Sequence, residues 1–142
     1  MGDRRSAREA ALQILFQQNF SEKGAAISYS LIKLDPNHDC TDFSNRIVAG
    51  VLRYRFDIDK TIKERAERWK TERMAIVDLN ILRIAIFEMV YGGETPAKVV
   101  INEAVDIAKK YGNENSGAFV NGILDAIHHA LPQVCPPLIR GS

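Results

Sequence analysis

Apolar residues recur at intervals of three and four along most of this chain, which is the spacing of one face of an α-helix. The first such stretch runs through Ala7, Ala11 and Leu15 and fades near Phe20. The alternation of polar and apolar residues that marks a half-buried strand is almost absent. The pattern therefore predicts an all-α protein.

About seven helices are predicted, joined by short connections. A break is expected at Asp57, and Pro132 is expected to close the last helix, because proline cannot continue the hydrogen-bonding pattern. No repeat period links the helices, so the pattern indicates one helical domain and not a repeat array. The predicted helices cover approximately residues 7–20, 27–34, 43–52, 58–66, 75–91, 96–111 and 116–131.

The last two predicted helices form a hairpin with a small polar corner. Thr95 is expected to cap the first of them, with Pro96 at its first helical position. Gly112 is expected to end it in a left-handed C-cap, and Asn115 or Ser116 to cap the next helix. We call the residues from Gly112 to Ser116 the elbow.

Length and composition are those of one ordinary globular domain. The chain has 142 residues, of which 46% are hydrophobic and 26% charged, enough for a single core. No apolar run approaches the roughly 18 residues that span a membrane, so no membrane association is expected. We assign residues 1–131 to the domain and residues 132–142, which are rich in proline, to a flexible tail.

Three arginines crowd the N-terminus although the formal net charge of the chain is only +1. On a helix, Arg4 and Arg8 share a face and Arg5 lies beside them. Guanidinium groups bind phosphates in a two-pronged fashion and stack on unpaired bases. The cluster is therefore a candidate RNA-binding site, although a solvated helix end would have the same sequence.

Catalytic motifs are missing from the chain. It has no Walker loop, no GxGxxG and no GxSxG motif. The three histidines are not spaced like metal ligands, and the two cysteines, Cys40 and Cys135, form no CxxC pair. We therefore expect no enzyme activity, no cofactor and no metal site.

Three blocks of sequence resemble the NusB family of bacterial transcription antitermination factors. The blocks are RRSAREAALQILF, WKTERMAIVDLNILRIAIFEM and TPAKVVINEAVDIAKKYGNENSGAFVNGILD, and they occur in the order of the family. Together they account for most of the chain between Arg4 and Asp125. The resemblance implies two antiparallel helix bundles packed together.

The resemblance also implies a function. It predicts a cytoplasmic RNA-binding factor that binds the single-stranded boxA element of leader RNA together with NusE, a small-subunit ribosomal protein. Such a factor helps to assemble antitermination complexes on RNA polymerase with other Nus factors, notably in ribosomal RNA operons. A monomer and a homodimer both stay open. The alternatives are a stand-alone relative of the N-terminal domain of RNA cytosine methyltransferases, or a protein-interaction module that does not bind RNA.

Site residues follow from the same resemblance. The residues expected to bind RNA are Arg4, Arg5, Arg8, Lys109, Asn115, Ser116 and Phe119. The residues expected to contact the protein partner are Phe16 and Asp78.

Each of these residues also has a structural interpretation. Asn115 or Ser116 caps a helix in that case, Phe119 and Phe16 fill the core, and Asp78 favours a helix N-terminus through the helix dipole. Asn115 replaces an aspartate that is common in the family. An amide removes the repulsion between a carboxylate and phosphate, which favours RNA binding.

Overall fold

The structure is a computed structural model, and it describes residues 2–20, 38–66, 74–92 and 95–134. These residues contain helices and no strand, so the all-α prediction is confirmed. The helix predicted over residues 27–34 lies outside the described residues. The elements are α1 (Gly2–Phe20), α3 (His38–Arg65), α4 (Ile76–Ile86), the π-helix η3 (Phe87–Gly92), α5 (Ala97–Tyr111) and α6 (Ser116–Val134).

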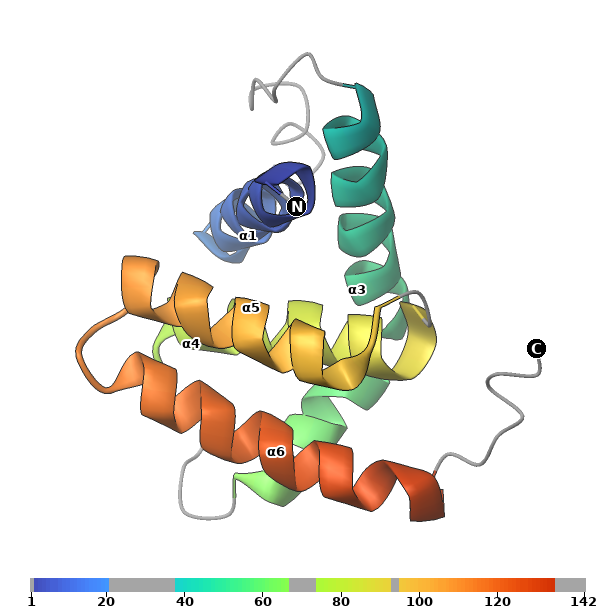
Figure 1. Cartoon of the computed structure of the whole chain (residues 1–142), viewed down its shortest axis with the longest axis vertical. Coiled ribbons are helices and arrows are strands. Elements are labelled where there is room, and N and C mark those ends of the chain that lie inside the picture. Colours follow the sequence, from blue (N-terminus) through green and yellow to red (C-terminus); the bar gives the residue numbers. More distant parts are fainter. Residues whose placement is uncertain (1, 21–37, 67–73, 93–94, 135–142) are drawn as a thin grey trace.

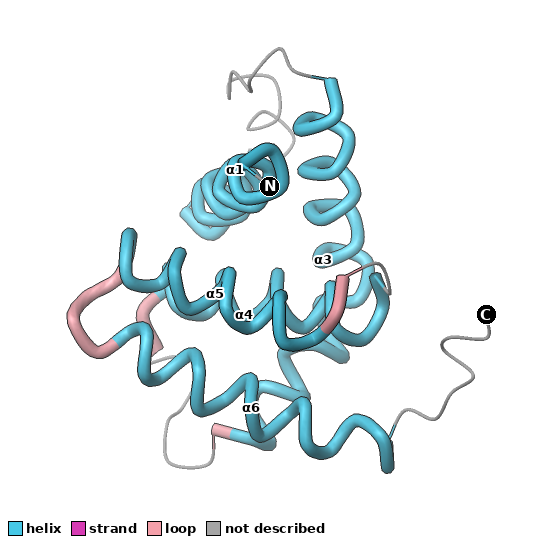
Figure 2. Tube along the Cα trace, viewed as in Figure 1, coloured by secondary structure: helices cyan, strands magenta, loops and turns pink. Residues whose placement is uncertain are grey.

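The helices pack as two groups (Figures 1 and 2). In the first, α1 lies against the N-terminal half of α3. In the second, α5 and α6 run antiparallel as the predicted hairpin, and α4 packs on both of them. Contacts of α1 and α3 with α4 join the two groups.

One continuous apolar core connects the two groups. Its members come from every helix, and most apolar positions that the sequence pattern selects turn inward, whereas Leu52 on α3 is exposed. Leu15, Val51, Ile84 and Ile123 are all buried, and Val105 is half-buried against them. The helical period therefore identifies the buried face of each helix correctly.

The predicted break at Asp57 is wrong in position. The predicted helices over residues 43–52 and 58–66 form the single element α3, which is kinked at Tyr54 (φ −103°, ψ 15°). The ring of Tyr54 stacks on Tyr91 of η3, with centroids 3.9 Å apart and planes within 6°. This contact lies between residues distant in sequence, and no local signal reveals it.

Three expected helix ends also need correction. The N-cap of α5 is Pro96, not Thr95, and the Pro96 carbonyl accepts the first backbone hydrogen bonds. Gly112 has φ −95°, outside the left-handed region that was expected. The last helix continues through Pro132 to Val134, so Pro132 does not close it.

A π-helix follows α4 directly, a rare element that is often found at functional sites. It carries Phe87, whose ring lies against the backbone of Gly50 on α3. A Cβ atom at position 50 would approach Cδ1 of that ring to 2.7 Å, so glycine is required for this contact. The π-helix also carries Glu88, a carboxylate with only 4% of its surface exposed.

Membrane spans and metal clusters are both missing from the part of the chain that the structure describes. Among those residues, no helix is long and apolar enough to cross a membrane. The same residues include no cluster of three or more histidine, cysteine, aspartate or glutamate side chains arranged to hold a metal ion.

Candidate nucleic-acid interface

The three N-terminal arginines occupy different environments although they are close in sequence. Arg4 is exposed, and its guanidinium lies 4.2 Å from the ring centroid of Phe43 on α3. Arg5 is partly exposed, whereas Arg8 is buried, with 4% of its surface exposed. Position along the helix explains the difference, because Arg8 lies one turn beyond Arg4, where α1 packs on α4 and the Arg8 side chain reaches Glu88 of η3.

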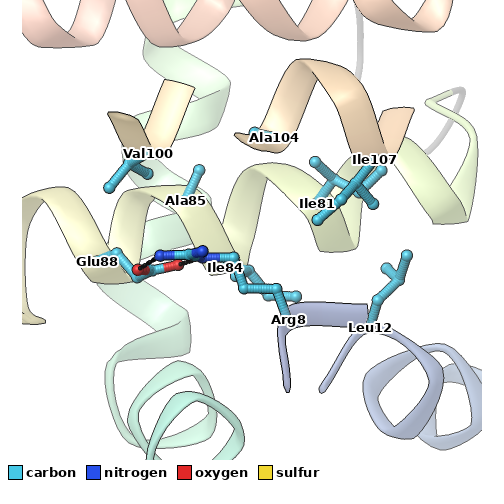
Figure 3. A pocket seen from close by; sticks show the side chains of 9 residues that line it. All are labelled: Arg8, Leu12, Ile81, Ile84, Ala85, Glu88, Val100, Ala104 and Ile107. Carbon is cyan, nitrogen blue, oxygen red and sulfur yellow. Dashed lines mark hydrogen bonds and ion pairs between the residues drawn. The ribbon is translucent and has the colours of Figure 1, made fainter. Parts of the chain in front are cut away.

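Arg8 forms a buried two-pronged ion pair with Glu88 (Figure 3). Its Nε donates to Oε2 of Glu88 at 2.6 Å, and its Nη2 donates to Oε1 at 2.8 Å. The pair lies among apolar side chains of α4, including Ile84 and Ala85. RNA binding by Arg8 was expected, but this geometry favours a structural role, since the guanidinium is buried and already paired with a carboxylate.

Arg5 joins α1 to α5. Its guanidinium donates to both oxygens of Glu103 and, at 3.0 Å, to Oδ2 of Asp106. The hydrogen bond to Glu103 is the main reason that the pKa of Arg5 is raised above its ordinary value. The same bond lowers the pKa of Glu103. Arg5 is therefore firmly positioned, with about a third of its side chain exposed.

Further contacts hold α1 beside the C-terminal end of α5. Lys110 donates to both oxygens of Glu9, at 3.1 and 3.2 Å, and Tyr111 donates its hydroxyl to Glu9 at 3.0 Å. The hydrogen bond to Glu9 raises the pKa of Lys110. The elbow follows directly after Tyr111, so Glu9 lies next to it, and Arg5 lies one helical turn away, beside Asp106.

The elbow is held together by its own polar groups. The Asn113 N–H donates to Oγ of Ser116 at 3.0 Å, and the Asn115 N–H donates to Oδ1 of Asn113 at 2.7 Å. Ser116 is 1% exposed, which favours the structural interpretation of this residue. Asn115 is exposed, so its side-chain amide is accessible to a ligand.

Gly112 is explained by a close approach and not by its backbone angles. A Cβ atom at this position would lie 2.6 Å from Cβ of Ser116 and 2.9 Å from the carbonyl oxygen of Ala108. Real side chains do not tolerate such distances, so only glycine allows Ser116 to fold back onto the end of α5.

Lys109 and Phe119 flank the elbow on the two helices. Lys109 is exposed, and its aliphatic stem lies against Gly117, where a Cβ atom would approach Cγ to 3.0 Å. Phe119 is half-buried against the core, so part of its ring is accessible. Stacking on a base and core packing are both compatible with this position, and RNA binding by Phe119 stays a prediction.

The two residues expected to contact a protein partner differ in exposure. Phe16 is half-buried on α1, next to the buried Leu15. Asp78 is 6% exposed in the first turn of α4, where a carboxylate interacts favourably with the helix dipole. This position favours the structural interpretation of Asp78, and its contact with a partner stays a prediction.

Sequence reasoning missed the acids that pair with the arginines. Glu88 lies in the apolar run ILRIAIFEMV, and a charged residue in such a run is a sign of a buried ion pair. Arg83 in the same run gives the same signal, because it is 5% exposed and pairs with Asp59 at 2.8 Å. The sequence contains these signals, but it does not reveal which partner each residue takes.

The described residues form a helical fold with exposed arginine, lysine and asparagine side chains near the elbow, which is typical of a nucleic-acid-binding adaptor. The NusB family profile matches residues 5–129, and the chain belongs to the NusB family. The chain is 42% identical to the transcription antitermination protein NusB of Geotalea daltonii, covering 93% of this chain and 98% of that protein. It is therefore a bacterial-type antitermination factor, as the sequence predicted.

Solved structures agree with this assignment. The NusB structure from T. maritima is 36% identical and superposes with a TM-score of 0.80, covering 89% of this chain and 90% of that one. NusB in a complex with NusE and double-stranded RNA is 26% identical, with a TM-score of 0.78, covering 92% of this chain and 98% of that one. These matches confirm the predicted NusB-like arrangement of helices.

Proposed function

We propose that this protein binds single-stranded boxA-type leader RNA together with NusE, and so helps to assemble antitermination complexes on RNA polymerase in the cytoplasm. Ribosomal RNA operons are the expected setting, and other Nus factors are the expected indirect partners. The mechanism is affinity and positioning, without bond chemistry. The observation that carries the proposal is the fixed position of α1 along α5, where the pairs Arg5–Asp106 and Glu9–Lys110 set Arg5 one helical turn before the end of α5 that leads into the elbow.

The geometry divides the expected RNA-binding residues into two groups. Arg4, Lys109 and Asn115 are exposed, and Arg5 is partly so. We assign RNA contacts to these four and to the accessible part of Phe119, whose ring is suited to stacking on a base. Arg8 and Ser116 are buried, and they hold the surface residues in place through their hydrogen bonds.

A relative supports this proposal. The complex of NusB with NusE and double-stranded RNA shows that a protein of the same fold assembles with both kinds of partner. The preference for a single strand is our own expectation. It rests on exposed groups that suit unpaired bases better than a regular duplex, whose base edges are less accessible.

Binding of a fluorescent boxA RNA tests the proposal, with and without NusE and at two salt concentrations. A scrambled single strand and a boxA duplex serve as controls. Each phosphate contact contributes about −0.7 to the salt slope for single strands, so Arg4→Ala and Lys109→Ala should each reduce the slope by about that amount. Binding to NusE without any RNA affinity would refute the proposal and support the protein-interaction module.

A further inference from the structure

A cavity opens beside the N-terminal arginines, outside the set of residues assigned above. It has a volume of about 180 Å³ and lies between α3, η3 and the segment that precedes α5. Phe43, Phe87 and Tyr91 supply aromatic walls, and Arg46, Glu88 and Thr95 supply polar groups. The typical range for drug-sized ligands is about 300–1,000 Å³, so this cavity suits a single ring system.

Positive charge surrounds one wall of the cavity. The guanidinium groups of Arg4, Arg8 and Arg46 lie 4.2, 5.3 and 5.5 Å from the centroid of the Phe43 ring. Among the described residues that line the cavity, the only carboxylate is Glu88, and its charge is balanced by Arg8. The local charge therefore complements a phosphate and repels a cationic ligand.

An aromatic row extends the cavity along the surface. The rings of Phe87 and Tyr91 are 6.4 Å apart, and Tyr91 stacks on Tyr54 at 3.9 Å. Arg53 lies 5.5 Å from the centroid of Tyr54. Tyr91 is also 36% exposed, which leaves part of its surface accessible. Aromatic rings that alternate with basic residues along a groove are the arrangement by which proteins bind single-stranded nucleic acid.

We propose that this cavity receives one unstacked nucleobase of the bound RNA. The base lies among Phe43, Phe87 and Tyr91, and Arg4 and Arg46 face the adjoining phosphates. Glu88 and the hydroxyl of Thr95 are the groups available to accept hydrogen bonds from the edge of the base. The inference rests on the proposed RNA binding and extends the RNA path from Arg4 onto α3 and η3.

Gly92 offers a way to fill the cavity without removing any contact. It lines the cavity, and a Cβ atom there would lie 3.6 Å from the Phe87 carbonyl oxygen and 3.9 Å from Cβ of Glu88, which are ordinary distances. Gly92→Leu therefore places a side chain at the cavity wall. Ala126→Leu is the matched control, since Ala126 is an exposed small residue on α6 that does not line the cavity.

Affinity for single-stranded boxA RNA is measured for the wild-type protein and both variants, with folding checked by thermal melting. Loss of one base–aromatic contact costs about 1–3 kcal/mol of binding free energy, which corresponds to roughly 5- to 150-fold weaker binding. We expect this loss for Gly92→Leu and none for Ala126→Leu. We also expect 2-aminopurine, placed at each RNA position in turn, to report one position whose fluorescence changes on binding to wild type but not to Gly92→Leu.

Several outcomes would overturn the inference. One is that Gly92→Leu binds RNA as tightly as the wild-type protein does. Another is that Gly92→Leu keeps its RNA affinity but loses binding to NusE, which would assign the cavity to a protein partner. Arg46→Ala gives a second test if Gly92→Leu does not fold, because Arg46 is exposed and its loss should reduce the salt slope by about 0.7. An unchanged slope would count against the cavity. Absence of RNA binding by the wild-type protein would instead overturn the proposed function, and this inference with it.

Discussion

Replacing Arg8 by alanine should destabilise the protein without removing an RNA contact. Arg8 and Glu88 are each 4% exposed and are joined by two hydrogen bonds of 2.6 and 2.8 Å. Removing one partner of a buried ion pair costs about 3–5 kcal/mol, because the other charge is left without compensation. For a domain of this size, that corresponds to a fall in melting temperature of roughly 10–20 °C.

Urea unfolding followed by circular dichroism measures this cost, and RNA affinity is measured on the same samples below the transition. Arg4→Ala is the matched control, since it removes the same side chain from the exposed first turn of the same helix. We expect it to change the unfolding free energy by no more than about 0.5 kcal/mol and to weaken RNA binding. We expect Arg8→Ala to lose stability and to keep its affinity per folded molecule.

The double replacement of Arg8 and Glu88 by methionine sharpens the test. Exchanging both members of a buried pair for apolar residues of similar volume is often neutral or stabilising, so much of the lost stability should return. The reasoning would be refuted if Arg8→Ala unfolded within about 1 kcal/mol of wild type while losing as much RNA affinity as Arg4→Ala. Arg8 would then be a contact residue and not an internal support.

Four further predictions concern the elbow and its supports. The pKa of Glu103 is lowered from its ordinary value of 4.5 by Arg5. Its contribution to stability is therefore present above that value and lost as the pH falls through the lower folded value. Glu103→Gln should accordingly melt below wild type at pH 7, and the difference should shrink in acid; a constant difference would contradict this cause. Gly112→Ala should cost about 1–3 kcal/mol through crowding of Ser116, whereas Gly122→Ala, with nothing within 4 Å of the added Cβ atom, should be neutral or stabilising in the same melting assay. Phe119→Ala should lower the unfolding free energy by about 2 kcal/mol, less than the roughly 3–5 kcal/mol of a fully buried ring. RNA affinity should fall as well if the accessible part of the ring stacks on a base. Intact affinity per folded molecule would remove Phe119 from the site. Asn115→Asp should lower RNA affinity by about 1 kcal/mol through repulsion of phosphate with unchanged melting, and equal affinity would show that position 115 does not face RNA.

The sequence alone determined which face of each helix turns inward. A helix buries a fixed face, so the helical spacing of Leu15, Val51 and Ile84 with their apolar neighbours is sufficient to identify their burial. The family blocks likewise located the elbow and the class of function. These features are local, or are held in a contiguous stretch of residues, and so the order of residues along the chain is enough to define them.

Only the tertiary structure decided which polar residues are exposed on the surface and which are buried in ion pairs that stabilise the fold. Arg4 and Arg8 share a face of the helix, but Arg8 is buried where α1 packs on α4, whereas Arg4 is exposed. The partners Glu88 and Glu103 lie 80 and 98 residues away from Arg8 and Arg5, respectively. The stacking of Tyr54, at the kink of α3, on Tyr91 of η3 is a further pairing of residues distant in sequence. Helical periodicity carries no information about such pairings, because they depend on how the helices are placed in space.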